Sequence, residues 1–198
     1  MGLSAGGTYV GLASQIAIQP FSWTSKRIAG KYYNSDISCW GTTANTGTGV
    51  DTLCATPFIV SERTSFDRIA IDVNTAQLGS LLRIGIYYDD ASTHYPSTLL
   101  YGSAALSGGV AGKVEEIIAI TLEPGLYWLA VNHDDATNTL EFTSPTSPTI
   151  PCVLGNDLTG QGNFGGWQVA SIFGAMPATF PAAGGDLVNR CFVFLRVA

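Results

Sequence analysis

Two apolar stretches decide the fold: Leu81-Leu82-Arg83-Ile84-Gly85-Ile86-Tyr87-Tyr88 and Leu126-Tyr127-Trp128-Leu129-Ala130-Val131. In the first, alternate residues from Leu82 to Tyr88 share one face, which is the period of a β-strand. The second is apolar on both faces. A strand of that kind is normally central in its sheet and covered on both sides. The two stretches therefore predict inner strands of a β-sandwich, with Tyr88 and Trp128 in its core.

Further strands are predicted on either side of this pair. Residues 66–73 alternate, with Ile69, Ile71 and Val73 on the inward face. Residues 51–60 also form a strand, in which Pro57 indicates an edge or a bulge. More strands follow at 99–101, 114–122 and 191–197. Short strands joined by Gly/Pro turns predict an all-β fold, an antiparallel β-sandwich of the jelly-roll type with about eight strands.

Residues 1–31 differ from the rest of the chain. Gly and Ser dominate there, and no strand or helix period is sustained. The segment is nevertheless too apolar for a solvated tail. We predict an extended N-terminal arm (1–31) for assembly or anchoring, followed by a jelly-roll sandwich (32–198). The alternative is a terminal strand of the same domain. The predicted contact residues of the arm are Tyr9, Ile16, Ile18, Phe21 and Trp23.

Composition excludes several classes of protein. Only 12% of the 198 residues are charged, and 23 are glycine, which disfavours a helical bundle. The net charge is −6, and Lys and Arg do not cluster, so nucleic acid is not an expected partner. No apolar run approaches the ~20 residues of a membrane span, so membrane insertion is not expected. The N-terminus lacks the pattern of a secretory signal, which predicts synthesis in a cytoplasm without processing.

The four cysteines are widely spaced and contain no CxxC pair. This spacing does not predict a zinc site, and the expectation is buried thiols that behave as small hydrophobic side chains. A bridge between Cys39 and Cys54 remains open, because spacing alone does not settle connectivity.

Two acidic pairs, Asp89-Asp90 and Asp134-Asp135, each follow an inner strand. If those strands are neighbours, the four carboxylates could gather at one end of the sandwich and form a calcium site. The alternative is that Asp serves as an ordinary turn residue that accepts hydrogen bonds from backbone amides. No other cofactor is expected.

His94 and His133 are the only histidines, and the sequence contains neither GxSxG nor HExxH. A catalytic pair of His133 with Asp134 or Asp135 is conceivable, as is a glycosidase built on paired carboxylates. A surface histidine beside loop acids is the commoner arrangement. We therefore predict no catalytic residue and no enzymatic activity.

Aromatic residues in loop-like contexts are candidate ligand contacts. Tyr95, Phe164 and Trp167 could stack on the apolar C–H faces of sugar rings, and core packing is the alternative. The loops at 89–97, 132–138 and 155–167 are expected to face outward.

Six short motifs follow one another between Lys31 and Ala130: Lys31-Tyr32-Tyr33, Ala55-Thr56-Pro57-Phe58-Ile59-Val60, Phe66-Asp67-Arg68-Ile69-Ala70-Ile71-Asp72-Val73, Leu82-Arg83-Ile84-Gly85-Ile86-Tyr87, His94-Tyr95-Pro96-Ser97-Thr98-Leu99-Leu100 and Leu122-Glu123-Pro124-Gly125-Leu126-Tyr127-Trp128-Leu129-Ala130. This ordered set resembles a jelly-roll module of tailed-phage virion proteins, which include head fibre, tail fibre, decoration and receptor-binding subunits. The resemblance covers about half of the chain. It implies a homotrimer attached to the virion through a preceding segment, and it carries over no catalytic residues.

The sequence therefore predicts a structural virion protein of a phage-like particle, a capsid or tail decoration or fibre subunit, made in the host cytoplasm. Its expected partners are copies of itself, other virion proteins through the arm, and a cell-surface glycan. The apolar composition, with 46% hydrophobic residues and a mean hydropathy of +0.24, also favours an oligomer. The alternatives are a carbohydrate-binding module that uses loop aromatics and calcium, and a glycan-active enzyme.

Overall fold

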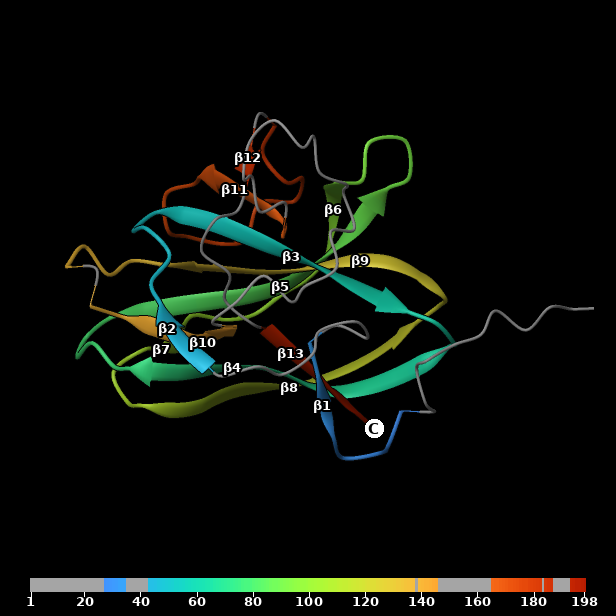
Figure 1. Cartoon of the computed structure of the whole chain (residues 1–198), viewed down its shortest axis with the longest axis horizontal. Helices are drawn as coiled ribbons and strands as arrows, with labels where there is room; N and C mark the ends of the chain where they lie inside the picture. The colour runs from blue at the N-terminus through green and yellow to red at the C-terminus, as the bar shows by residue number, and fades with distance from the viewer. Residues whose placement is uncertain (1–26, 35–42, 138, 146–164, 183, 187–192) are drawn as a thin grey trace, which may run out of the picture.

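A computed structural model describes residues 27–34, 43–137, 139–145, 165–182, 184–186 and 193–198. These residues form two antiparallel sheets that pack face to face, and none of them lies in a helix (Figure 1). The predicted all-β sandwich is confirmed. Within the same ranges there is accordingly no helix long and apolar enough to cross a membrane.

One sheet has six strands in the described part of the chain. It contains β1 (Tyr32–Tyr33), β13 (Val193–Val197), β4 (Thr64–Thr75), β10 (Glu141–Pro145) and β2 (Thr43–Thr46) in that order, with β8 (Gly112–Leu122) also paired to β4. The seven-stranded sheet contains β12 (Gly185–Asp186), β11 (Trp167–Ala170), β3 (Thr52–Val60), β9 (Gly125–His133), β5 (Leu81–Asp90) and β6 (Tyr95–Gly102), with β7 (Leu106–Ser107) also paired to β5. The chain passes from one sheet to the other at most connections, as in a jelly roll.

The two stretches that decide the fold are β5 and β9, and they pair directly. Their register runs from Leu82 opposite His133 to Tyr88 opposite Tyr127. On its other side β9 pairs with β3, so both predicted inner strands are internal to the sheet. Their inward side chains fill the sandwich with residues of the six-stranded sheet. This core includes Leu82, Ile84, Ile86, Leu129 and Val131 from one sheet, and Phe66, Ile69, Ile71, Val73 and Leu195 from the other.

The outer face of the seven-stranded sheet is also covered. Tyr87 and Trp128 point to that side and are fully buried there, beneath Met176 and Phe180. Residues 176–181, which we call the outer strap, follow β6 through hydrogen bonds from Leu99 N to Ala178 O (2.9 Å) and from Phe180 N to Ser97 O (2.8 Å). The inner strands are therefore covered twice, as their composition predicted.

One detail of this packing depends on a single glycine. A Cβ added at Gly85 would lie 2.7 Å from the carbonyl oxygen of Tyr101 and 3.2 Å from Met176 Cε, so β5 approaches its neighbours closely at that position.

The prediction that Tyr88 lies in the core is wrong. Tyr88 is exposed at the rim beside Tyr127, and the adjacent Tyr87 is the buried tyrosine.

Pro57, which predicted an edge or a bulge, lies where β3 has a described partner strand on one side only. In the described chain β11 pairs only with residues 52–55 of β3, so the end of β3 that contains Pro57 has β9 as its one partner strand. The carbonyl of Ile59, two residues further and on the same side, accepts a hydrogen bond from Arg27 Nη2 (2.7 Å). The position of Pro57 therefore needs no backbone donor.

The residues that precede β1 pack on the sandwich. The Arg27 guanidinium lies 4.8 Å from the centroid of the Phe58 ring and 5.4 Å from that of Phe66. Gly30 N donates to Val197 O (2.8 Å). Residues 27–31, which we assigned to the N-terminal arm, thus contact the domain. The predicted contact residues of the arm, Tyr9, Ile16, Ile18, Phe21 and Trp23, lie outside the described residues.

Phe180→Ala should lower the free energy of unfolding by about 3 kcal/mol, because it removes a buried ring that packs edge-to-face on Tyr87 at 5.3 Å. Chemical denaturation measures the change. Ile117→Thr is the control, since that side chain is 73% exposed on β8, the new residue keeps the β-branch, and the change should alter stability by less than about 0.5 kcal/mol. Equal effects of the two substitutions would show that the outer strap does not contribute to the folded core.

Candidate functional site

The two acidic pairs lie at opposite ends of β5. Asp89-Asp90 ends that strand, whereas Asp134 Oδ1 accepts a hydrogen bond from Leu81 N at its beginning (2.7 Å). The predicted gathering of four carboxylates is therefore wrong, because neighbouring antiparallel strands terminate at opposite ends of the sheet. The described residues contain no group of three or more His, Cys, Asp or Glu side chains placed to hold a metal ion.

Asp135 organises the turn that leads to β10. Its Oδ1 accepts from Thr137 N (2.9 Å), and its Oδ2 accepts from Thr139 N and Leu140 N (2.7 Å each). Burial acts to raise the pKa of Asp135, but the hydrogen bonds from the Thr137 hydroxyl and the three amides outweigh it and lower the pKa to about 2. This carboxylate has the turn role that we set out as the alternative to a calcium ligand.

His133 is buried between backbone groups. Its Nε2 lies 2.6 Å from Thr48 O, and its Nδ1 accepts a hydrogen bond from Asp135 N (3.2 Å). The imidazole therefore donates at one nitrogen and accepts at the other. His133 contacts the backbone amide of Asp135 and not its carboxylate. The catalytic pair of His133 with the Asp135 carboxylate is therefore not formed.

Asp89 connects the core to the β5–β6 turn. Its Oδ1 accepts from the indole Nε1 of Trp128 (2.8 Å), and its Oδ2 lies 3.0 Å from His94 Nδ1. The adjacent Asp90 accepts from the amide and the hydroxyl of Ser92 (2.8 and 2.6 Å). Both hydrogen bonds lower the pKa of Asp90, and the one from the Ser92 hydroxyl contributes most. His94 itself has a φ of 50°, in the left-handed region that a tight turn requires.

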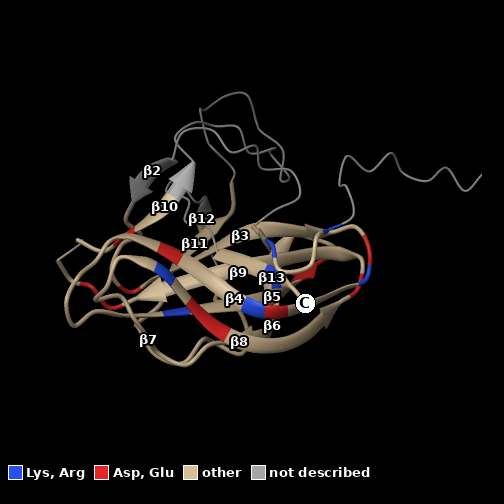
Figure 2. Ribbon diagram, turned by 90° about the horizontal axis from the view of Figure 1, so that it is seen from below, with Lys and Arg blue, Asp and Glu red and all other residues tan. Residues whose placement is uncertain are grey.

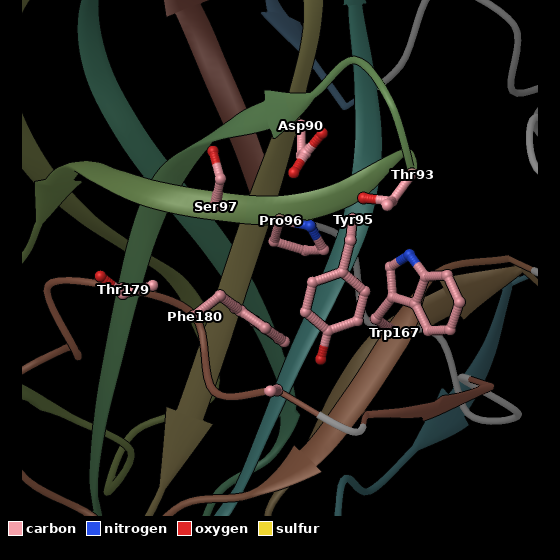
Figure 3. A pocket seen from close by; sticks show the side chains of 9 residues that line it. Asp90, Thr93, Tyr95, Pro96, Ser97, Trp167, Thr179 and Phe180 are labelled. Atoms are coloured by element: carbon pink, nitrogen blue, oxygen red, sulfur yellow. The ribbon is translucent and has the colours of Figure 1, made fainter.

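Next to this turn lies an open groove of about 420 Å³, which we call the aromatic groove (Figure 3). It brings together two of the three predicted ligand contacts, Tyr95 and Trp167, whose ring centroids are 4.9 Å apart at an interplanar angle of 58°. The third, Phe164, lies outside the described residues. The groove is lined by Asp90, Thr93, Tyr95, Pro96, Ser97, Trp167, Thr179, Phe180 and Ala182.

Backbone groups hold both rings in place. The Tyr95 hydroxyl donates to Pro181 O (2.6 Å) and accepts from Gly184 N (3.0 Å). Trp167 Nε1 donates to His94 O (3.0 Å). Burial raises the pKa of Tyr95, although the bond from Gly184 opposes this, so the hydroxyl stays protonated at neutral pH. The polar atoms of both rings are thus engaged, and their carbon surfaces border the groove.

Sequence reasoning missed the contribution of the outer strap. Phe180 forms part of the groove and packs against Tyr95 with ring centroids 5.5 Å apart, while Thr179 lies on the rim. The strap has no strand period and sits among Gly and Pro residues. The only signal was a pair of large apolar residues, Met176 and Phe180, in an otherwise loop-like segment.

Cys54 is a free, buried thiol whose pKa is raised by burial to about 12, which fits the expected small hydrophobic side chain. The other three cysteines lie outside the described residues. Comparison of the sequence with protein-family models and with curated proteins found no significant match.

Asp135 should make stability depend on pH in an acid window. Its pKa is lowered from 3.8 to about 2, so its contribution is complete above about pH 4.5 and is lost as the pH falls to about 2. The loss should be about 2 kcal/mol. The Asp135→Asn protein should be less stable at pH 6 and should lose less on acidification. Denaturant titrations from pH 6 to pH 2 measure this.

Asp134→Asn is the matched control, because Asp134 precedes Asp135 directly and accepts one hydrogen bond from Leu81 N. At pH 6 it should lose less stability than the Asp135→Asn protein, because Asp135 accepts four hydrogen bonds. Identical pH profiles of the Asp135→Asn protein and the unsubstituted protein would contradict the turn role of this carboxylate.

Proposed function

We propose that the chain is a structural subunit of a phage-like particle, a capsid or tail decoration or fibre subunit. It works by assembling with copies of itself and with other virion proteins, and it presents a surface for host attachment. The observation that carries this proposal is a group of exposed aliphatic side chains at one end of the sandwich.

We call this group the end patch: Leu78, Val110 and Ile172, with exposed fractions of 90%, 72% and 86%. The loops of Leu78 and Val110 lie side by side, since Gln77 N donates to Gly108 O (3.1 Å). Ile172 follows β11, whose last strand residue pairs with Thr52 at the beginning of β3. All three follow or precede strand ends at the same end of the sandwich, where β3 and β5 begin and β9 ends. These strand ends lie at the left in Figure 1.

The outer face of the six-stranded sheet carries one strongly exposed aliphatic residue in the described chain, Ile117, among paired charges. There Arg196 Nη2 pairs with Asp67 Oδ2 (2.6 Å), and Lys113 Nζ pairs with Glu115 Oε2 (3.0 Å). Figure 2 shows such acidic and basic residues side by side on the strands of this sheet. Charged groups that satisfy each other in this way suit a solvated face. Large aliphatic side chains gain about 1.5–3 kcal/mol each when buried, so the end patch favours contact with another subunit.

The geometry of the N-terminal segment fits the same arrangement. Arg27 packs beside Phe58 and Ile59, near the end of β3, whereas the end patch lies where β3 begins. A preceding arm would therefore join the sandwich at the end away from the patch. Anchoring to a particle at one end leaves the other free for neighbouring subunits. The six phage-like motifs also fall in order on β1, β3, β4, β5, β6 and β9.

The proposal predicts a homo-oligomer, with a trimer favoured by the resemblance. Native mass spectrometry and light scattering measure its mass. Leu78→Ser combined with Val110→Ser should weaken association at least about tenfold, because burial of two aliphatic side chains is lost. Ile117→Ser is the control, since Ile117 is 73% exposed but lies on β8, away from the end patch.

A protein that stays monomeric at high micromolar concentration would contradict assembly through the end patch. So would a double variant that associates as tightly as the Ile117→Ser control.

The aromatic groove favours a second function, recognition of carbohydrate. Its two rigidly held rings and its polar rim suit a sugar better than a flat surface does. In a particle this function would serve attachment to a host-surface glycan. In a chain that acts alone, it would be the function of a carbohydrate-binding module.

A further inference from the structure

We infer that the aromatic groove binds an uncharged saccharide and discriminates against anionic sugars such as sialic acid. This inference rests on the second proposed function, carbohydrate recognition, and names its ligand class. Two features of the groove carry it: which atoms of the rings face the ligand, and which charges surround them.

The first feature is the apolar surface of the rings. The Tyr95 hydroxyl and the Trp167 indole N–H are both bonded to backbone atoms. A ligand therefore meets the carbon surfaces of two rings inclined at 58°, with Phe180 beside them (Figure 3). Pyranose rings present C–H groups on one or both faces, and such groups pack well on aromatic carbon.

The second feature is the rim. It carries the hydroxyls of Thr93, Ser97 and Thr179 and the carboxylate of Asp90, and none of the described residues that line the groove is Lys or Arg. Hydroxyl groups of a sugar can donate to the carboxylate and exchange hydrogen bonds with the two threonines. They can also donate to Ser97, whose own hydroxyl already donates to Tyr88 O (3.1 Å). Because Ser92 holds the carboxylate of Asp90 in its ionised form, a second negative charge in the groove would be repelled.

The same groups argue against a cationic ligand. Aromatic rings with a nearby acid also attract quaternary ammonium groups. Three of the four polar side chains on this rim are hydroxyls, however, and a quaternary ammonium has no hydrogen to donate to them. The groups on the rim match a polyhydroxylated ligand.

The groove is formed before any ligand arrives. Tyr95 begins β6, Trp167 begins β11, and Phe180 is fixed by the hydrogen bond from its amide to Ser97 O. Three segments that are far apart in the sequence thus converge through hydrogen bonds that do not involve the ligand. Such preorganisation reduces the entropy lost when a ligand binds.

The test is an array of paired oligosaccharides, each displayed with and without a terminal sialic acid, followed by calorimetry on the best pair. Tetramethylammonium, tested by calorimetry, is included as a cationic arm. The native protein should bind the uncharged member of the pair at least about tenfold more tightly than the sialylated member. Asp90→Asn should reduce that ratio several-fold, because it removes the charge and keeps the shape.

Two variants locate the site. Trp167→Ala should weaken binding of the uncharged sugar about tenfold or more. Thr179→Trp should do the same by filling the groove from an exposed position, and it removes no contact on which folding depends. Tyr88→Ala is the control, because Tyr88 is an exposed aromatic residue outside the groove. It should leave affinity within about twofold.

The outcomes separate the two levels of the proposal. Equal or tighter binding of the sialylated members would overturn the ligand class and leave carbohydrate recognition intact. Absence of binding to every sugar, or binding to tetramethylammonium alone, would overturn both. Binding that Tyr88→Ala weakens as much as Trp167→Ala does would move the site away from the groove.

Discussion

The structure depends on one constraint: β9 is apolar on both faces, and Tyr87 of its partner β5 also points outward, so the chain must cover this pair of strands twice. The first cover is the six-stranded sheet, which packs on Ile84, Ile86 and Leu129. The second cover is the outer strap, which packs Met176 and Phe180 on Tyr87 and Trp128. Large aromatic side chains left in water would cost several kcal/mol of stability, so a sandwich of two sheets alone would not satisfy this sequence.

The second cover also creates the candidate site. The buried indole of Trp128 needs an acceptor for its N–H, and Asp89 provides one at 2.8 Å. The other oxygen of this carboxylate lies 3.0 Å from the His94 ring, and the carbonyl of His94 accepts from Trp167. A chain of hydrogen bonds therefore leads from the core to the aromatic groove. Ring positions in the groove are set by the same contacts that satisfy the buried groups of the sheet.

Much of the fold could be predicted from the sequence, because alternation of apolar residues reports directly on strands with one buried face. Ile69, Ile71 and Val73 follow that rule. Pro57 was informative for another reason: it has no N–H to donate, and it lies where β3 has a described partner strand on one side only. Alternation does not report where the core ends along a strand. For this reason Tyr88, on the correct face but at the rim, was predicted to be buried, and its neighbour Tyr87 was not.

The candidate site was harder to predict because it depends on contacts between distant segments. The two acidic pairs were expected together if their strands were neighbours, but the antiparallel pairing of β5 with β9 puts the ends of these two strands at opposite ends of the sheet. His133 was expected on the surface, yet the backbone at Thr48 and Asp135 encloses it. Tyr95 and Trp167 were expected in loops, but they begin β6 and β11, and the outer strap, which has no periodic pattern, completes their groove.

The most direct test of this account is amide hydrogen exchange at Phe180, compared with Ile86 and Leu129 in the central strands. If both covers belong to one cooperative core, the Phe180 amide, which donates to Ser97 O at 2.8 Å, should exchange only through global unfolding, with the same free energy of opening as the two strand amides. Fast exchange at Phe180 while Ile86 and Leu129 stay protected would show that the outer face does not need its cover, and would contradict the account.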